Sequence, residues 1–199
     1  MTQATNKAKG RSVAKASDPL SKLAAKTVGR GVAVTGTTGR QRESSLAANV
    51  LKLHWQDFRE VFRSAPTARI DLIRNGVPAD DFKLYVTGLG VPQERVYRML
   101  KIPTATVNRK AALHEALTPE ESAKVVGMAK LIGQVETMLA ESGDPEEIAD
   151  FDSGKWLTDW MERPLPALGG SRPAEYMDTI EGQEMISRIL AMMQSGAYA

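Results

Sequence analysis

The sequence PLPALGGSRPAEYMDTIEGQEMISRILAMMQSGAYA spans Pro164–Ala199. Its prolines, glycines and helix-capping residues are placed more specifically than in a generic amphipathic helix. A proline-rich opening leads to a turn at Gly169–Gly170, and Pro173 then starts a short helix. A longer helix follows and ends before Gly196, which suits the position just beyond a helix C-terminus. This stretch predicts a small helical module that closes with a short tail.

The last helix of this module carries one apolar stripe that must pack on another element. Asp178 is predicted to cap the helix, and Glu181 three residues later completes a capping-box pattern. At Gly182, in the first turn, alanine would favour the helix by roughly 0.8–1.0 kcal/mol, so the absent side chain indicates close approach of another backbone. The stripe consists of residues spaced by three and four: Ile180, Met185, Ile186, Ile189, Leu190 and Met193.

Ala197, Tyr198 and Ala199 form a tail that is too short to fold by itself. The tyrosine ring has an apolar face and a polar tip, a combination that suits a pocket on a partner protein. We therefore expect Tyr198 to act as an anchor. The alternative interpretation is a frayed terminus.

A long helix is predicted ahead of the C-terminal module. Thr118–Glu121 forms a capping box, and the apolar pattern that follows continues to Ser142–Gly143. The wide apolar face of this helix has two interpretations, a seam between two copies of the chain or burial within its own chain. Asp144–Glu147 then starts another helix, in which Trp156 and Trp160 stand four residues apart and anchor the core of the C-terminal module.

Gln93–Leu113 has the spacing of a helix-turn-helix. Thr104 is predicted to cap the second helix. Tyr97 and Lys101 depart from the usual pattern, which often has a small residue at the first of these positions and glycine at the second. The residues predicted to face inward or to close the turn are Val96, Leu100, Ile102, Val107 and Ala111.

The side chains left on the outer face of this motif suit the phosphates and base edges of a DNA major groove. The alternative is an ordinary three-helix packing unit whose basic residues only solvate it. The outward set consists of Thr104, Ala105, Asn108, Arg109 and Lys110.

The remaining sequence predicts further helices over 46–63, 68–74 and 78–87 and no convincing strand, so the expected fold class is all-α. Residues 1–45 contain too few apolar side chains to bury much surface and are expected to be disordered. The expected organisation is a disordered basic arm over 1–45, a helical domain with the helix-turn-helix over 46–117, a connecting or dimerisation helix over 118–143, and the C-terminal module over 144–199.

Charge is unevenly distributed along a chain whose formal net charge is only +2. Residues 1–45 hold nine Lys and Arg against two Asp and Glu, whereas residues 115–199 hold six against sixteen. This asymmetry indicates that residues 1–45 bind a polyanion and that residues 115–199 bind a basic protein surface. The alternative is that both charged regions only interact with solvent.

The composition argues against enzymatic activity. The chain has no cysteine, and its two histidines, His54 and His114, have no neighbouring nucleophile or metal-ligand spacing in the sequence, so we expect neither a catalytic nor a metal site. No apolar run approaches the length of a membrane span, and the absence of cysteine suits a reducing cytoplasm. We expect a soluble, cytoplasmic, non-enzymatic protein that needs no cofactor.

The C-terminal motif resembles the toxin-binding domain of the Xre/MbcA/ParS antitoxins, bacterial proteins that neutralise RES-domain toxins. The resemblance covers about residues 146–199 and extends more loosely from about residue 68. The residues that carry it are Trp160, Pro164, Ala167, Leu168, Gly169, Gly170, Pro173, Tyr176, Met177, Thr179, Gly182, Ile186, Leu190, Gly196, Ala197 and Tyr198.

This resemblance implies a homodimeric type II antitoxin that covers the active site of a RES-domain toxin, an enzyme that consumes NAD or uses it for ADP-ribosylation. It also implies that the helix-turn-helix binds operator DNA and represses the antitoxin's own operon. An alternative is a helix-turn-helix transcriptional regulator whose C-terminal domain only oligomerises; another is a helical interaction module without a role on DNA. The implied toxin-binding residues are Leu168, Gly169, Gly170, Tyr176, Gly182, Arg188, Gly196, Ala197 and Tyr198.

Overall fold

The computed structural model describes residues 53–142 and 150–195, and within these ranges the fold is all-helical. The single β-type contact among them is an isolated bridge between Pro78 and Ala116. The predicted arm over 1–45, the predicted helix start over 144–147 and the tail from 196 to 199 lie outside the described residues. The elements are α2 Phe58–Arg63, α3 Pro66–Asn75, α4 Ala79–Gly88, α5 Gln93–Met99, α6 Thr104–Ala112, α7 Pro119–Ser142, α9 Ser153–Trp160, η1 Pro166–Leu168, η2 Pro173–Tyr176 and α10 Ile180–Gln194.

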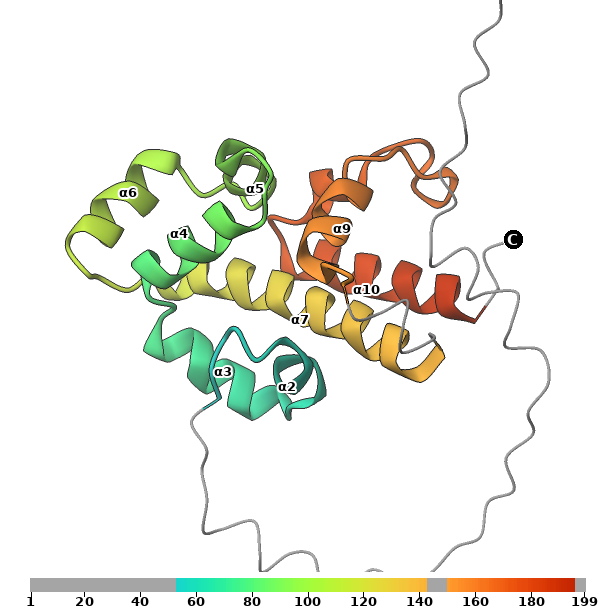
Figure 1. Cartoon of the computed structure of the whole chain (residues 1–199), viewed down its shortest axis with the longest axis horizontal. Helices are drawn as coiled ribbons and strands as arrows, with labels where there is room; N and C mark the ends of the chain where they lie inside the picture. The colour runs from blue at the N-terminus through green and yellow to red at the C-terminus, as the bar shows by residue number, and fades with distance from the viewer. Residues whose placement is uncertain (1–52, 143–149, 196–199) are drawn as a thin grey trace, which may run out of the picture.

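Helix α7 runs through the middle of the molecule, and the other elements are arranged around it (Figure 1). Helices α2 and α3 pack on one side of α7, α9 and α10 on the other, and α4, α5 and α6 form a cluster near its first turns. Gly133 lets α2 approach closely, because a Cβ atom at this position would lie 1.9 Å from the carbonyl oxygen of Phe58. The buried apolar residues of α7 are Val125, Val126, Met128, Ala129, Leu131, Ile132, Val135, Met138 and Leu139.

The first turn of α7 has the predicted capping box. The backbone N–H of Thr118 donates to Glu121 Oε2 at 2.8 Å, and the backbone N–H of Glu121 donates to Thr118 Oγ1 at 3.2 Å. The apolar face of this helix is covered by helices of the same chain. Of the two interpretations of that face, burial within the chain therefore applies, and the described part of α7 offers no free apolar seam.

Two element boundaries differ from the sequence prediction. Trp55 precedes α2 instead of lying inside a longer helix, and its ring packs edge-on against Phe82 and Tyr85 with centroids 6.1 and 5.5 Å away. This aromatic packing fixes the chain ahead of α2 without helical hydrogen bonds. Helix α9 starts at Ser153, where Asp152 accepts a hydrogen bond from the Lys155 backbone N–H at 2.8 Å. Among the described residues, no helix combines the length and apolar character needed to cross a bilayer.

Candidate functional site

The predicted helix-turn-helix corresponds to α5, a tight turn and α6 (Figure 1). Lys101 takes a left-handed backbone conformation with φ of 48°, which explains why this position of the motif often carries glycine. The capping prediction for Thr104 was wrong, because Pro103 precedes the helix and no side-chain hydrogen bond caps it. The residues predicted to face inward are buried: Val96, Leu100, Ile102, Val107 and Ala111.

The outward face of α6 is less basic than predicted. Ala105, Asn108 and Arg109 are exposed and Thr104 is half-buried. Arg109 lies 3.6 Å from the carboxylate of Glu115, and both side chains are largely exposed, so this ion pair is weak. The face therefore offers one exposed cation and a set of small neutral groups.

Lys110 does not belong to this face, which corrects the sequence prediction. Its side chain is only 10% exposed, and its Nζ donates to the carbonyl oxygen of Ala116 at 3.1 Å. The same nitrogen lies 3.5 Å from the carboxylate of Glu121 in the capping box of α7. Lys110 thus fastens α6 to the start of α7 and is not available to a DNA phosphate.

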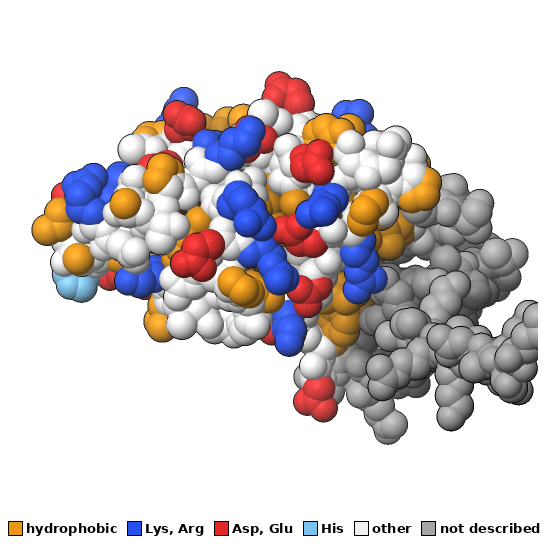
Figure 2. Space-filling view, turned by 90° about the horizontal axis from the view of Figure 1, so that it is seen from above, with side chains coloured by type: hydrophobic (Ala, Val, Ile, Leu, Met, Phe, Trp, Pro, Cys, Tyr) orange, Lys and Arg blue, Asp and Glu red, His pale blue; other side chains and the backbone are white. Residues whose placement is uncertain are grey.

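Three ion pairs connect the first helix and turn of this motif to the C-terminal module. They are Arg95 with Asp159 at 2.9 Å, Arg98 with Glu162 at 3.6 Å, and Lys101 with Asp178 at 2.7 Å. Figure 2 shows Lys and Arg side chains interspersed with Asp and Glu across this face of the molecule, with no large patch of one sign. The described helix-turn-helix therefore provides little uncompensated positive charge for a polyanion.

Asp178 has a different role from the predicted one. Thr179 caps α10 by accepting a hydrogen bond from the Gly182 backbone N–H at 3.1 Å. The hydrogen bond from Lys101 holds the pKa of Asp178 below its ordinary value, so the carboxylate stays charged. The cap prediction was wrong by one residue because the Asp178 side chain is engaged by Lys101, which lies in the turn after α5, 77 positions away in the chain.

The C-terminal module is built on the two tryptophans that the sequence singled out. Trp156 and Trp160 stack with ring centroids 5.9 Å apart and an interplanar angle of 14°. Trp160 is buried together with Leu157 and Met161, and these side chains join the core that surrounds α7. The prediction that Trp160 anchors the core is confirmed, and the Trp156 ring packs on it.

The loop that joins η1 to η2 carries the glycine pair. Gly169 and Gly170 have φ of 62° and 88°, and a Cβ atom at either position would meet nothing within 4 Å. Backbone conformation, and not crowding, therefore selects glycine at both positions. The loop is held in place because the backbone N–H of Gly170 donates to the carbonyl oxygen of Leu165 at 3.0 Å. Leu168 is half-buried beside the exposed glycines, so the turn forms a firm protrusion.

Gly182 has the close backbone contact that the sequence predicted. A Cβ atom there would lie 1.9 Å from the carbonyl oxygen of Tyr176, so the start of α10 rests directly on the end of η2. Gly182 is buried, and the lack of a side chain there lets these two elements pack closely. Ile180 is 64% exposed, which corrects its predicted place in the buried stripe. Helix α10 starts at this residue, so its side chain projects beyond the core-facing turns.

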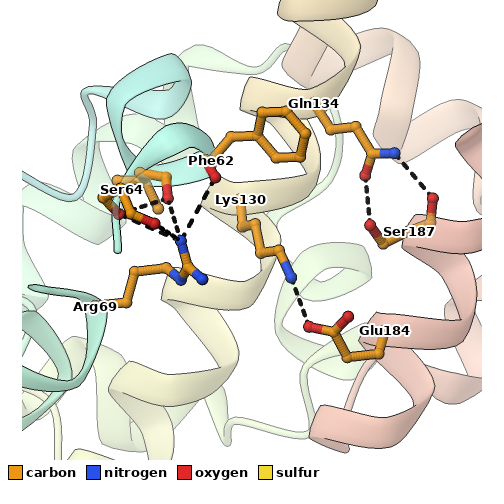
Figure 3. A network of polar contacts seen from close by, with 8 residues as sticks. Phe62, Ser64, Arg69, Lys130, Gln134, Glu184 and Ser187 are labelled. Atoms are coloured by element: carbon orange, nitrogen blue, oxygen red, sulfur yellow. Dashed lines mark hydrogen bonds and ion pairs between the residues drawn. The ribbon is translucent and has the colours of Figure 1, made fainter. Parts of the chain in front are cut away.

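Polar contacts hold α10 on α7, as Figure 3 shows. Gln134 Nε2 donates to the carbonyl oxygen of Ser187 at 2.9 Å, and Ser187 Oγ donates to Gln134 Oε1 at 2.7 Å. Lys130 pairs with Glu184 one turn earlier. Arg188 lies on the exposed side of α10, where a partner can reach it.

His114 has a polar partner, which is distant in the sequence. Its Nδ1 lies 2.9 Å from the Asp80 carboxylate, and this hydrogen bond holds the pKa of Asp80 below its ordinary value. The pair is exposed, and the described part of the chain contains no group of three side chains able to hold a metal ion. The pair therefore joins α4 to the end of α6 without forming a recognisable reaction centre.

Comparison with known proteins identifies both halves of this structure. Residues 148–196 match the antitoxin Xre/MbcA/ParS C-terminal toxin-binding domain, and residues 68–130 match the antitoxin Xre-like helix-turn-helix domain. A protein of Sphingobium sp. (strain YBL2) named Prs ADP-ribosylating antitoxin is 45% identical over 142 residues, which cover 71% of this chain and 87% of that protein. The chain belongs to the Xre/MbcA/ParS antitoxin family. It is therefore a type II antitoxin and not an enzyme.

A more distant relative has the same kind of name. The protein called antitoxin Xre of Yersinia enterocolitica serotype O:8 / biotype 1B is 21% identical over 136 residues, which cover 68% of this antitoxin and 84% of that protein. The toxin-binding match includes every implied contact residue that the structure describes: Leu168, Gly169, Gly170, Tyr176, Gly182 and Arg188. The other three, Gly196, Ala197 and Tyr198, lie outside the described residues.

Sequence reasoning missed the contacts that join the two halves of the antitoxin. Arg95, Arg98 and Lys101 were not assigned to the acidic residues of the C-terminal module, because each pair is separated by more than sixty positions. The excess of acidic residues toward the C-terminus was the available signal. It indicated a cationic partner but not that part of this partner is the antitoxin's own helix-turn-helix.

Proposed function

We propose that this antitoxin neutralises a RES-domain toxin by covering its active site with the C-terminal module. The contact surface would include the turn at Leu168–Gly170, the exposed side of α10 with Arg188, and the tail Gly196–Tyr198. The observation that carries this proposal is an exposed glycine turn held by a backbone hydrogen bond, in the same module as a helix with an exposed outer side. The turn is held by a backbone hydrogen bond and α10 by its packing on α7. Binding a partner would therefore cost these elements little conformational entropy.

The toxin is proposed to be an ADP-ribosylating enzyme. The Sphingobium relative carries ADP-ribosylation of Prs in its name, and its similarity extends over 87% of its length. NAD is the ADP-ribose donor in such a reaction, so a module that fills the NAD cleft would block the enzyme without any chemistry of its own. The antitoxin needs no cofactor for this steric role.

The antitoxin is further proposed to form a homodimer, to assemble with its toxin into a higher hetero-oligomer, and to repress its own operon. Helix α6 would enter the major groove of operator DNA with Thr104, Ala105, Asn108 and Arg109 outermost. The basic sequence over 1–45 supports this proposal through its nine cations, since neutralising phosphates supplies much of the affinity for DNA. The two-fold symmetry of such a homodimer would match a palindromic operator.

Deleting Ala197–Ala199 is expected to weaken toxin binding roughly thirtyfold, which corresponds to losing an interface hot spot of about 2 kcal/mol. The reason is the loss of Tyr198, the one aromatic side chain of the tail. The antitoxin and a RES-domain toxin would be purified, and the dissociation constant of their complex measured by calorimetry.

Deletion of Ala199 alone is the matched control and should leave the affinity unchanged. Equal affinity of the longer deletion would remove the anchor role of Tyr198. Failure of the full-length antitoxin to bind any RES-domain protein would remove the proposed function itself.

Replacing Arg109 with alanine is expected to weaken binding to a promoter fragment of the antitoxin's own operon. Loss of one phosphate contact should lower the steepness of the logarithm of affinity against the logarithm of salt concentration by about 1. Fluorescence anisotropy at several salt concentrations measures this change. Arg188→Ala removes the same charge from a helix on another side of the molecule and serves as the control. Equal salt dependence of both variants would show that α6 does not contact DNA.

A further inference from the structure

A groove lies where α3 and α10 face each other across α7. Arg69 and Ile73 of α3 form one wall, Ile180 and Glu184 of α10 form the other, and Lys130 of α7 lies between them. Figure 3 looks into this region and shows Arg69, Lys130 and Glu184 facing the space between the helices. The groove is open to solvent, and its volume of about 120 Å³ is enough for one or two apolar side chains of a partner.

The two helices that form the walls of this groove carry exposed apolar side chains. Ile180 is 64% exposed on α10, and Ile70 is 43% exposed on α3, one helical turn before Ile73. Met192, further along α10, is 40% exposed. Only two other large apolar side chains of the described residues are similarly exposed, Leu84 and Leu113, and neither lies on these helices. Of these side chains Ile180 lines the groove, and exposed apolar side chains on the helices that form a groove are typical of a protein-binding surface.

The polar groups of the groove favour an acidic partner. Its lining includes two cations, Arg69 and Lys130, against one carboxylate, Glu184. Lys130 pairs with that carboxylate, whereas the hydrogen bonds of Arg69 all come from one terminal nitrogen, which donates to carbonyl oxygens at the end of α2. The rest of the Arg69 guanidinium remains able to receive a carboxylate. This small excess of positive charge comes from α3, whereas Lys130 and Glu184 belong to the acidic stretch 115–199.

We propose that the toxin occupies this groove, so that its docking surface extends from the C-terminal module across α7 onto α3. The occupant would be a toxin segment with an apolar side chain next to an Asp or Glu. This inference rests on the proposed function and adds a contact from the other half of the antitoxin. The wall formed by α10 belongs to the matched toxin-binding domain, and the wall formed by α3 belongs to the matched helix-turn-helix domain. One wall of the groove thus belongs to the domain that binds the toxin in this family.

Alanine substitutions of Ile180 and Ile70 test this inference in the full-length antitoxin. Each is expected to raise the dissociation constant for the same RES-domain toxin roughly tenfold, as removing an apolar interface anchor does. Both side chains are exposed and both positions are helical, so alanine should leave the fold intact. Thermal unfolding of each variant verifies this.

Leu84→Ala and Leu113→Ala are matched controls, since they remove equally exposed apolar side chains away from the groove, and they should bind the toxin as the parent does. Tenfold weakening by Ile180→Ala with no effect of Ile70→Ala would overturn the inference, because the toxin would then contact α10 alone. Unchanged toxin affinity of both variants together with weaker self-association in sedimentation would assign the groove to a second copy of the chain. If the parent antitoxin binds no RES-domain protein, the proposed function fails first, and the inference fails with it.

Discussion

Replacing Gly182 with alanine is expected to lower the free energy of unfolding by about 2 kcal/mol and to weaken neutralisation of the toxin. The added Cβ atom would lie 1.9 Å from the carbonyl oxygen of Tyr176, a backbone atom that no rotamer change can move. Overpacking of this kind costs typically 1–3 kcal/mol, which exceeds the gain of roughly 0.8–1.0 kcal/mol that alanine brings to a helix. Helix α10 must then shift from η2, and the exposed side of α10 moves relative to the glycine turn.

Urea unfolding followed by circular dichroism measures the loss of stability, and inhibition of the toxin by the purified variant measures the functional effect. Gly88→Ala is the matched control, because Gly88 is also helical and a Cβ atom there would meet nothing within 4 Å. This variant should be as stable as the parent or slightly more stable. A Gly182→Ala protein with parental stability would contradict the close contact between α10 and η2.

Replacing Lys110 with methionine is expected to lower the free energy of unfolding by roughly 2–3 kcal/mol, the cost of leaving a partly buried charge and a carbonyl oxygen without their partner. The carboxylate of Glu121 is 16% exposed and would lose its nearest cation, and the Ala116 carbonyl oxygen would lose a hydrogen bond. Methionine keeps most of the apolar stem, so the change isolates the ammonium group. The neighbouring Arg109→Ala variant should retain parental stability, because that side chain is 61% exposed.

The same substitution should change how stability depends on pH. Burial alone would raise the pKa of Glu121, but hydrogen bonds from Thr118 and the charge of Lys110 outweigh it and hold the pKa below the ordinary value of 4.5. The stabilisation from this carboxylate is therefore complete above pH 4.5 and is lost as the pH falls through the lower pKa of the folded state. The Lys110→Met protein should lose less stability on acidification than the parent. Equal acid sensitivity in unfolding experiments between pH 3 and about 6 would refute the Lys110–Glu121 coupling.

The parts of the fold that depend on local chemistry were predictable from the sequence. The capping box of Thr118 and Glu121, the close approach at Gly182 and the turn position of Lys101 each follow from residues within a few positions of one another. The helical periodicity of α5, α6 and α7 also placed the core residues correctly. Such signals survive in one sequence because they arise from backbone conformation and short-range hydrogen bonds.

The parts that depend on distant partners were not predictable. The periodicity of α6 predicts that Lys110 points outward. Its burial depends on Glu121, which lies on the next helix and pairs with it. The local sequence predicts Asp178 as a helix cap, but in the structure its carboxylate pairs with Lys101. The spacing places Ile180 in the apolar stripe, but α10 starts at this residue. For the candidate site, the sequence predicted the turn and the last helix as contact elements, whereas the proposed contribution of α3 depends on the packing around α7.

The central position of α7 limits how such antitoxins can exchange parts by recombination. The helix-turn-helix match ends at residue 130, in the interior of a helix that runs without a break from Pro119 to Ser142. A crossover at that boundary would join the first half of α7 from one parent to the second half from another. Helices α2, α3 and α10 all pack on α7, so each would then face a helix that comes only partly from its own parent. Viable chimeras should therefore inherit residues 119–142 from a single parent, together with the helices on both sides that fit them.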